Sequence, residues 1–222
     1  MGNLLHGILE NLDFSAGKPE IQRMVENKLG AFKEFTENHK ATITEWIDTV
    51  FAKKLPGYAG KLCDVGTDKK MAELSFLMNS KAGKINLNEI KATIKIPDIL
   101  EKDLPSKYID GKIDLIFLGE DKKYYILDWK SNKLDNYSTS EMEAEMISHS
   151  YHLQYYIYAV ALKRWLKRMH GEDYFRENFG GVYYIFLRGV RKDLENFDGI
   201  YFAKADDIVD SIEKLDKILT EK

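Results

Sequence analysis

Three charged residues interrupt the most apolar part of the chain. Residues 111–118 and 123–130 are almost continuously apolar, a pattern that predicts two strands buried on both faces. Asp114 lies in the first segment, and Asp128 and Lys130 lie in the second. Charges in a core are costly unless they are paired, hydrogen-bonded or bound to a metal. These three residues are therefore the first candidates for chemistry.

The spacing of the three charges predicts that they converge. In an antiparallel hairpin whose turn is centred near Asp121, Asp114 pairs with Asp128, which puts their Cβ atoms roughly 4.5–5.5 Å apart. Asp128 and Lys130 are two residues apart on one strand, so both side chains point to the same face. Mg²⁺ takes a few carboxylates and keeps water or substrate phosphate as its other ligands. A lysine beside such a site can position or deprotonate an attacking water.

A simpler interpretation of the same residues is a buried Asp–Lys ion pair that only stabilises the hairpin. That interpretation accounts for one carboxylate and leaves the other without a partner.

The segments around these residues resemble a known nuclease family. GKIDLIF, YYILDWKSN, HLQYYIYAVAL and FGGVYYIFLRGV are closely similar to the C-terminal nuclease domain of RecB proteins, the beta subunits of exodeoxyribonuclease V, within the PD-(D/E)XK nuclease superfamily. A D-x-K motif alone is weak, but the ordered set with its spacing is specific. The resemblance runs from the helix around Leu4 to about Tyr201. It implies a restriction-endonuclease-like α/β fold, with a mixed central β-sheet flanked by α-helices and extra N-terminal helices.

The resemblance also implies roles for individual residues. Asp114, Asp128 and Lys130 match the family's catalytic residues, with Asp114, Asp128 and the backbone carbonyl of Trp129 as metal ligands. His6 matches a histidine that lies in a Leu-x-His helix of the family and contributes a nitrogen to the metal. Neutral imidazole is a reasonable third ligand beside two carboxylates. A histidine next to an apolar helix face is otherwise more often a boundary residue.

Three further residues are accessory candidates. Glu73, in an expected strand at residues 70–79, matches an acidic residue that assists metal binding in the family; the alternative is an exposed strand residue. Gln154 and Tyr158 are four apart on an expected helix, so they project from one face, and they match the family's Gln-x-x-x-Tyr motif. Gln can bond a phosphate and Tyr can stack on a base. Alternatively, the tyrosines here simply pack against the sheet.

Composition sets outer bounds on the function. The 222 residues are 44% hydrophobic and 31% charged, which is typical of a globular protein, and no apolar run approaches the length of a membrane span. The net charge of −3 gives no overall basic field, so phosphate binding must come from local lysines and metal. The single cysteine, Cys63, excludes an internal disulfide and a four-cysteine iron–sulfur cluster and favours a reducing, cytoplasmic location. No P-loop is present, so we expect no ATPase in this chain.

The expected organisation is one domain over residues 1–222. A helical N-terminal part (1–60) carries His6, a nuclease core spans residues 70–204, and a C-terminal helix spans residues 205–222. Further expected elements are helices at 2–12, 20–35, 41–55, 86–94, 140–149 and 151–170, strands at 181–188 and 200–204, and a loop bracketed by Pro97 and Pro105. Because a functional helix begins at Gly2, the chain is interpreted as an excised domain.

The function predicted from these features is Mg²⁺-dependent hydrolysis of DNA phosphodiester bonds with one or two ions, in a site that Ca²⁺ or Mn²⁺ could also occupy. By resemblance, the parent enzyme processes linear duplex ends and single strands in recombinational repair, together with RecC and RecD subunits and with RecA. One alternative is an inactive DNA-binding or subunit-docking module on a nuclease fold. Another is a standalone nuclease. Arg188 and the basic helix end at residues 163–168 are candidate backbone contacts, with structural ion pairs and a solvated face as the simpler alternatives.

Overall fold

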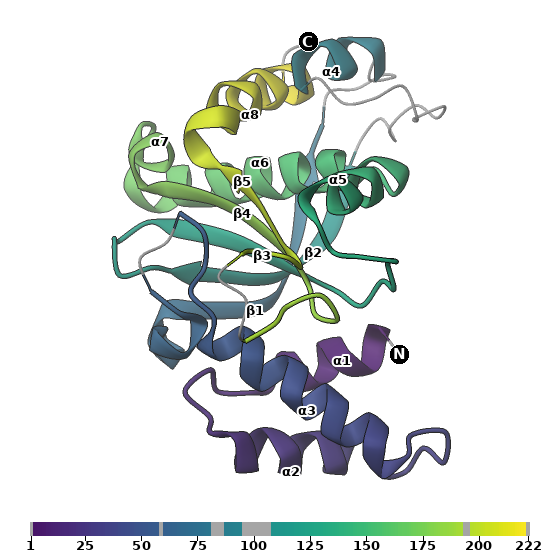
Figure 1. Ribbon diagram of the computed structural model, residues 1–222. Helices are drawn as coiled ribbons and strands as arrows, with labels where there is room; N and C mark the ends of the chain where they lie inside the picture. The colour runs from purple at the N-terminus through teal and green to yellow at the C-terminus, as the bar shows by residue number, and fades with distance from the viewer. Residues whose placement is uncertain (1, 58–59, 81–86, 95–107, 193–195, 221–222) are drawn as a thin grey trace.

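A five-stranded mixed sheet forms the centre of the molecule (Figure 1). The computed structural model describes residues 2–57, 60–80, 87–94, 108–192 and 196–220. The strands lie side by side in chain order, β1-β2-β3-β4-β5, and only β3 and β4 are parallel. The strands are β1 (Lys70–Asn79), β2 (Tyr108–Leu118), β3 (Tyr124–Lys130), β4 (Phe179–Phe186) and β5 (Ile200–Lys204).

Helices cover both faces of this sheet, so the α/β prediction is confirmed. On one face lie α1 (Gly2–Leu9), α2 (Lys18–Leu29) and α3 (Glu37–Ala52). On the other lie α4 (Leu87–Ile94), α5 (Thr139–Ser148), α6 (Tyr151–His170), α7 (Tyr174–Asn178) and α8 (Ala205–Thr220). Two short 3-10 turns, Leu62–Asp64 and Thr67–Lys69, precede β1. No helix among the described residues combines the length and apolar character needed to cross a bilayer.

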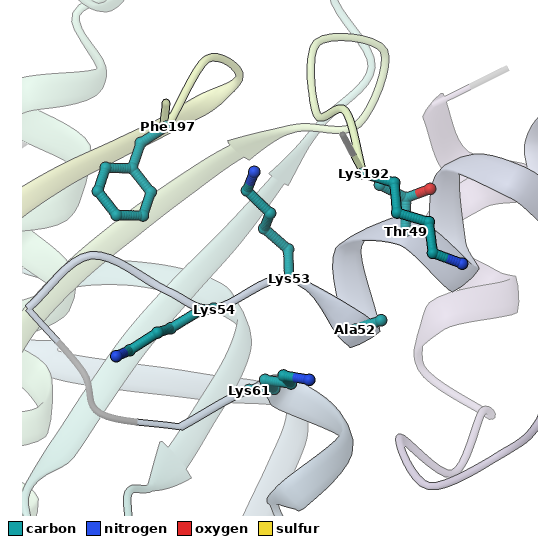
Figure 2. A pocket seen from close by; sticks show the side chains of 7 residues that line it. All are labelled: Thr49, Ala52, Lys53, Lys54, Lys61, Lys192 and Phe197. Atoms are coloured by element: carbon teal, nitrogen blue, oxygen red, sulfur yellow. The ribbon is translucent and has the colours of Figure 1, made fainter. Parts of the chain in front are cut away.

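Local sequence features determine where helices α2 and α3 begin. Pro19 lies in the first turn of α2, where a missing N–H costs nothing. Thr36 caps α3 by accepting a hydrogen bond from the backbone of His39, whose side chain in turn accepts from the Thr36 backbone. Where α3 ends, its last turn and the segment after β4 enclose a hollow (Figure 2).

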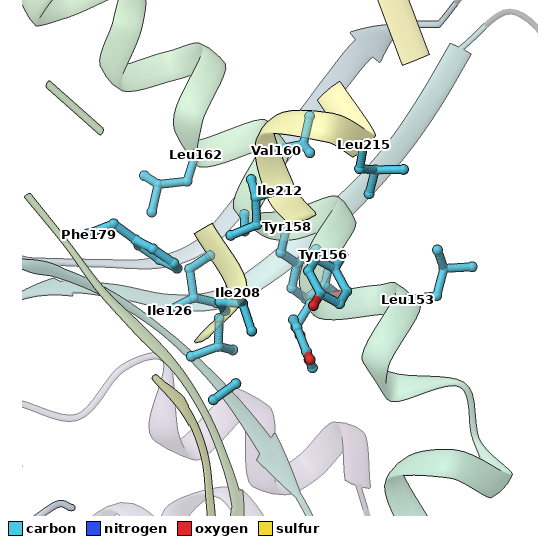
Figure 3. Packing of buried hydrophobic residues seen from close by; sticks show 14 of the residues in the cluster. Ile126, Leu153, Tyr156, Tyr158, Val160, Leu162, Phe179, Ile208, Ile212 and Leu215 are labelled. Carbon is cyan, nitrogen blue, oxygen red and sulfur yellow. The ribbon is translucent and has the colours of Figure 1, made fainter. Parts of the chain in front are cut away.

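The opposite layer is built on α6 and α8, whose apolar faces meet the sheet (Figure 3). The buried residues of α6 form a broad stripe, along which Tyr155, Ala159, Leu162 and Leu166 recur every three or four positions, as in an amphipathic helix. The basic end of α6 is largely neutralised by structural pairs. Lys163 and Arg164 both pair with Asp216 of α8, and Lys167 pairs with Glu172. The simpler alternative for this charge run was a solvated face, but Lys163 and Arg164 are instead part-buried in ion pairs.

Element boundaries differ from the predicted ones mainly at the ends. The strand at 70–79 and the helix at 151–170 have the predicted bounds. β2 begins three residues earlier than predicted, at Tyr108, and β4 lies two residues earlier, at 179–186. The second helix ends at Leu29, just before Gly30, and not at residue 35 as predicted. The short helix α7 was not predicted. The loop bracketed by Pro97 and Pro105 lies outside the described residues.

Candidate active site

The β2–β3 hairpin has the predicted register. Leu115 pairs with Leu127 at the end of the ladder, and Asp114 and Asp128 are the next residues on the two strands. The backbone N–H of Trp129 donates a hydrogen bond to Asp114 Oδ2 at 2.8 Å. The two aspartates therefore lie just beyond the last backbone-paired residues of the hairpin, where the Trp129 N–H bonds a side chain.

On both β1 and β2, the regular alternation of side chains between the two faces of the sheet is broken at the level of Asp114. On β1, Leu74 and Phe76 pack against the α6 side, but so does Met71, which regular alternation would put on the other face. Glu73, between them, has a left-handed backbone with φ of +55°, which is rare for a residue other than glycine. On β2, Ile113 and Ile116 share one face, so alternation breaks beside Asp114.

The irregular backbone on β1 and β2 changes the direction in which the Glu73 and Asp114 side chains leave the sheet. The β1–β2 register runs through Ala72–Leu115 and Leu74–Ile113, which brackets Glu73 and Asp114 as opposite neighbours. Strained backbone of this kind costs about 1–3 kcal/mol and persists where the surroundings impose it, often at functional sites. The Glu73 side chain is 13% exposed and pairs with Lys112, so the alternative of an exposed strand residue does not hold, and its accessory role in metal binding stays a prediction.

His6 reaches the same carboxylates from the other layer. Its Nδ1 lies 3.2 Å from Asp114 Oδ1, and one ligand atom from each of His6, Glu73 and Asp114 falls within 4.8 Å of the other two. The hydrogen bond with Asp114 raises the pKa of His6 above its usual value; burial opposes this, and the nearby carboxylates reinforce it. Glu10, a turn further along the chain, is exposed.

Asp128 is the most buried charge of the site. It is 2% exposed and forms an ion pair with Lys130, two residues along β3. Burial and the neighbouring charge of Asp114 raise the pKa of Asp128 to about 6, although Lys130 acts in the opposite direction. Within the described part of the chain, Asp128 Oδ1 accepts no well-aligned hydrogen bond. It therefore has a coordination position to offer beyond its contact with the lysine.

Aromatic rings and one amide surround the Lys130 ammonium. Its Nζ lies 3.9 Å from the centre of the Tyr151 ring and 4.9 Å from that of Tyr184, distances typical of cation–π attraction. It also donates to Gln154 Oε1 at 3.4 Å. The same oxygen accepts from the Tyr184 hydroxyl at 2.9 Å, and Gln154 Nε2 donates to the Tyr158 hydroxyl at 2.9 Å. Gln154 thus connects the lysine to two buried tyrosines.

An open groove continues from the Gln154–Tyr158 face of α6. It measures about 390 Å³ and is lined by α6 and by the β1 and β2 strands, including Phe76, Ile109 and Ile157. The Phe76 and Tyr158 rings meet edge to face, with centroids 5.9 Å apart. Tyr158 is 8% exposed, so it packs in the core and still presents its hydroxyl to Gln154.

The structure brings one set of predicted side chains to one region: His6, Glu73, Asp114, Asp128, Lys130, Gln154 and Tyr158. It also adds groups that the sequence analysis missed. Tyr151, Tyr184 and Lys112 contact the site but were not predicted. The parallel β3–β4 register pairs Asp128 with Tyr184, and single-sequence alternation does not reveal that register. Arg188 has a structural role: it donates to the Ser131 carbonyl at 2.9 Å and lies over the Trp46 ring. The Trp129 carbonyl as a metal ligand stays a prediction.

Comparison with known proteins agrees with this geometry. Residues 1–221 match the PD-(D/E)XK nuclease superfamily. The chain belongs to this superfamily. It is 33% identical over 203 residues to the RecBCD enzyme subunit RecB of Escherichia coli, a match that covers 86% of this chain and 17% of the relative. The subunit RecB of Buchnera aphidicola subsp. Schizaphis graminum is 34% identical over 167 residues, covering 71% of this chain and 14% of the relative. The chain thus spans about a sixth of these relatives' length.

The donor set of this PD-(D/E)XK site fits a divalent cation. One imidazole nitrogen and the carboxylates of Glu73 and Asp114 converge. Asp128 lies outside this three-residue cluster, on the strand next to Asp114, and carries a buried oxygen whose contact is the Lys130 ammonium. Mostly oxygen ligands with one nitrogen suit a hard or borderline divalent ion such as Mg²⁺ or Mn²⁺. His6, Glu73, Asp114 and Asp128 are the residues that could hold it.

Proposed function

We propose that this chain hydrolyses DNA phosphodiester bonds with the help of a divalent metal, Mg²⁺ in the first place. The observation that carries the proposal is the cluster of His6, Glu73 and Asp114, with ligand atoms within 4.8 Å of one another, beside the buried Asp128–Lys130 pair. An ion pair that served only to stabilise the hairpin would not explain a strained glutamate and a histidine at the same point.

The carboxylates and His6 are proposed to hold the metal and thereby fix the position of the scissile phosphate. When bound, Mg²⁺ would supply Lewis-acid stabilisation of the charge that develops on the phosphate oxygens. His6 binds in its neutral form, because a protonated imidazole has no lone pair to give. Asp114 is held for this purpose by the Trp129 N–H, which fixes one oxygen and leaves the other beside His6.

Lys130 is proposed to position the attacking water through its ammonium and, once it has lost a proton to solvent, to take up the proton of that water at Nζ as the neutral amine. The Tyr151 and Tyr184 rings and the Gln154 amide restrict the ammonium to one place. Orientation of this kind lowers the barrier because the nucleophile is already aligned with the phosphorus. Gln154 and Tyr158 face the neighbouring groove, where we expect the substrate strand to run.

We further propose that the chain acts as the nuclease part of a RecBCD-type helicase–nuclease. The support is its similarity to RecB subunits, of which it spans about a sixth. By that similarity the whole enzyme would process linear duplex ends with RecC and RecD subunits and would act with RecA, while ATP hydrolysis would lie outside this chain.

The test is ATP-free cleavage of end-labelled single- and double-stranded DNA in Mg²⁺ and in EDTA. Asp114→Asn, Asp128→Asn and Lys130→Gln should each remove metal-dependent cleavage. Asp135→Asn and Lys133→Gln are matched controls, because these residues are exposed and lie just beyond β3; both should cleave like the wild type.

Two results would oppose the proposal. Cleavage that survives in all three site variants would mean that another site, or a contaminant, is responsible. A folded wild type that binds DNA but does not cleave it, alone or with its partner subunits, would identify an inactive DNA-binding or docking module.

A further inference from the structure

A second concave surface lies on the α3 side of the molecule. It measures about 400 Å³ and lies between the end of α3 and the segments that follow α3 and β4. We call it the lysine pocket; its lining residues are Thr49, Ala52, Lys53, Lys54, Lys61, Lys192 and Phe197. Figure 2 shows Phe197 across the hollow from Lys192, with Lys53 between them.

The charge of the lysine pocket departs from that of the chain. Acidic residues outnumber basic ones overall, with 36 against 33, yet the described lining holds four lysines and no carboxylate. A concave site with one sign of charge concentrates the opposite charge. The expected ligand is therefore an anion with several negative groups.

The backbone fixes where two of these lysines leave the chain. Lys54 and Lys61 form an isolated antiparallel bridge, and Figure 2 shows their ammonium groups pointing away from each other. The Lys53 ammonium is fixed by a hydrogen bond to the Arg191 carbonyl at 3.1 Å. Ammonium groups that leave separate segments around one hollow suit a ligand with several negative charges.

The lysine pocket is connected to the candidate active site through the ends of two parallel strands. The Leu187 N–H donates to the Lys130 carbonyl at 2.9 Å, and Arg188 donates to the Ser131 carbonyl at 2.9 Å. Lys192 follows Arg188 by four residues. The pocket and the candidate active site are therefore built in part on segments that leave the same end of the β3–β4 pair.

Phe197 indicates which polyanion fits. Its side chain is 43% exposed beside the lysines, whereas large aromatic side chains are usually covered. An exposed ring among cations suits a single nucleic-acid strand, whose bases are free to stack while its phosphates meet the lysines. Bases in a duplex are paired and stacked, so they are not free to stack on the ring.

We propose that the lysine pocket binds single-stranded DNA, with phosphates on Lys54, Lys61 and Lys192 and a base on Phe197. The choice of DNA as the polyanion rests on the proposed function. The preference for a single strand rests only on the lysines and on the exposed Phe197 ring.

The first test is the salt dependence of binding to an oligothymidylate. EDTA is present to remove divalent metal, so that binding is measured without cleavage. Each phosphate contact on a single strand contributes about 0.7 to the slope of log K against log salt concentration. The triple variant Lys54→Gln, Lys61→Gln, Lys192→Gln should therefore lower the magnitude of the slope by about 2. The matched control replaces the exposed Lys28, Lys214 and Lys217 by Gln and should leave the slope unchanged.

The second test concerns the ring. Phe197→Leu should weaken oligothymidylate binding about tenfold and leave duplex binding unchanged, because stacking requires an unpaired base. Phe32→Leu removes another exposed aromatic ring, outside the pocket, and should have no effect. Replacing the three lysines by Arg should retain the slope, which separates loss of charge from loss of fold.

The outcomes separate this inference from the proposed function. If the pocket and control triple variants have the same slope of log K against log salt concentration, the inference is overturned, even if the wild type cleaves DNA. A lower slope in the pocket variant alone would support it even if no cleavage is found.

Discussion

At the scale of single residues, the position of Lys130 depends on Gln154, whose Oε1 accepts from both Lys130 and Tyr184. Tyr184→Phe keeps the ring beside the ammonium but removes the hydroxyl that orients the amide. We expect the rate of metal-dependent cleavage to fall on the order of ten- to hundredfold with little change in KM for DNA, because orientation and not binding is lost. Single-turnover kinetics measures this.

Tyr183→Phe is the control for that variant. Tyr183 is the neighbouring residue of β4, and its hydroxyl donates to the Pro56 carbonyl at 2.6 Å on the opposite face of the sheet. Each variant loses a buried hydrogen bond and should lose about 1 kcal/mol of stability. Only Tyr184→Phe should slow cleavage. If both variants slow it equally, the loss reflects stability and not the position of Lys130.

The pH dependence of His6 follows from its raised pKa. Because the folded pKa lies above the unfolded value near 6.5, the contact with Asp114 stabilises the metal-free protein fully below pH about 6.5. This contribution is lost as pH rises through the folded pKa. We therefore expect His6→Gln to lower the Tm in EDTA more at pH 6 than at pH 8.5. An equal loss at both values would mean that His6 is not charged in the fold.

At the scale of elements, the sequence predicted the strands and the register of the hairpin better than the point where the strands are distorted. Continuous apolar runs identified the β2–β3 hairpin and its register, and the pairing near Asp114 and Asp128 follows from that register. The break in alternation at Glu73 could not be predicted, since a left-handed glutamate is set by neighbouring strands and not by local preference. The Tyr184 contact likewise depends on a long-range parallel pairing.

The strain at Glu73 predicts a trade-off between stability and function. Glu73→Gly and Glu73→Ala both remove the carboxylate, and both should impair metal-dependent cleavage. They differ in backbone freedom, because glycine adopts φ near +55° without the clash that a Cβ introduces. We expect the Gly variant to be more stable than the Ala variant by about 1 kcal/mol in urea unfolding with EDTA.

The neighbouring residue controls for a general effect of glycine. Ala72 has an ordinary negative φ, so Ala72→Gly should destabilise β1 by about 0.5–1 kcal/mol. If Glu73→Gly is also less stable than Glu73→Ala, the left-handed backbone is not a source of strain at that position.

At the scale of the whole molecule, the candidate site joins the two helical layers through the sheet. His6 comes from the α1–α3 layer, Glu73, Asp114 and Asp128 come from three strands, and Gln154 comes from α6 on the opposite face. A ligand held by groups from separate elements binds the folded state and not the unfolded chain. It should therefore stabilise the entire fold and not one segment.

Divalent metal is accordingly expected to raise the Tm in the absence of DNA. At a concentration one hundred times Kd the gain is about 2.7 kcal/mol, which corresponds to a rise on the order of 5–10 °C for a domain of this size. Asp114→Asn should abolish the rise, because Asp114 lies between His6 and Glu73 at the centre of the cluster. Asp135→Asn, at an exposed position, should respond like the wild type. A rise of equal size in Asp114→Asn would mean that the stabilising metal binds elsewhere, and the four-residue ligand set would then be wrong.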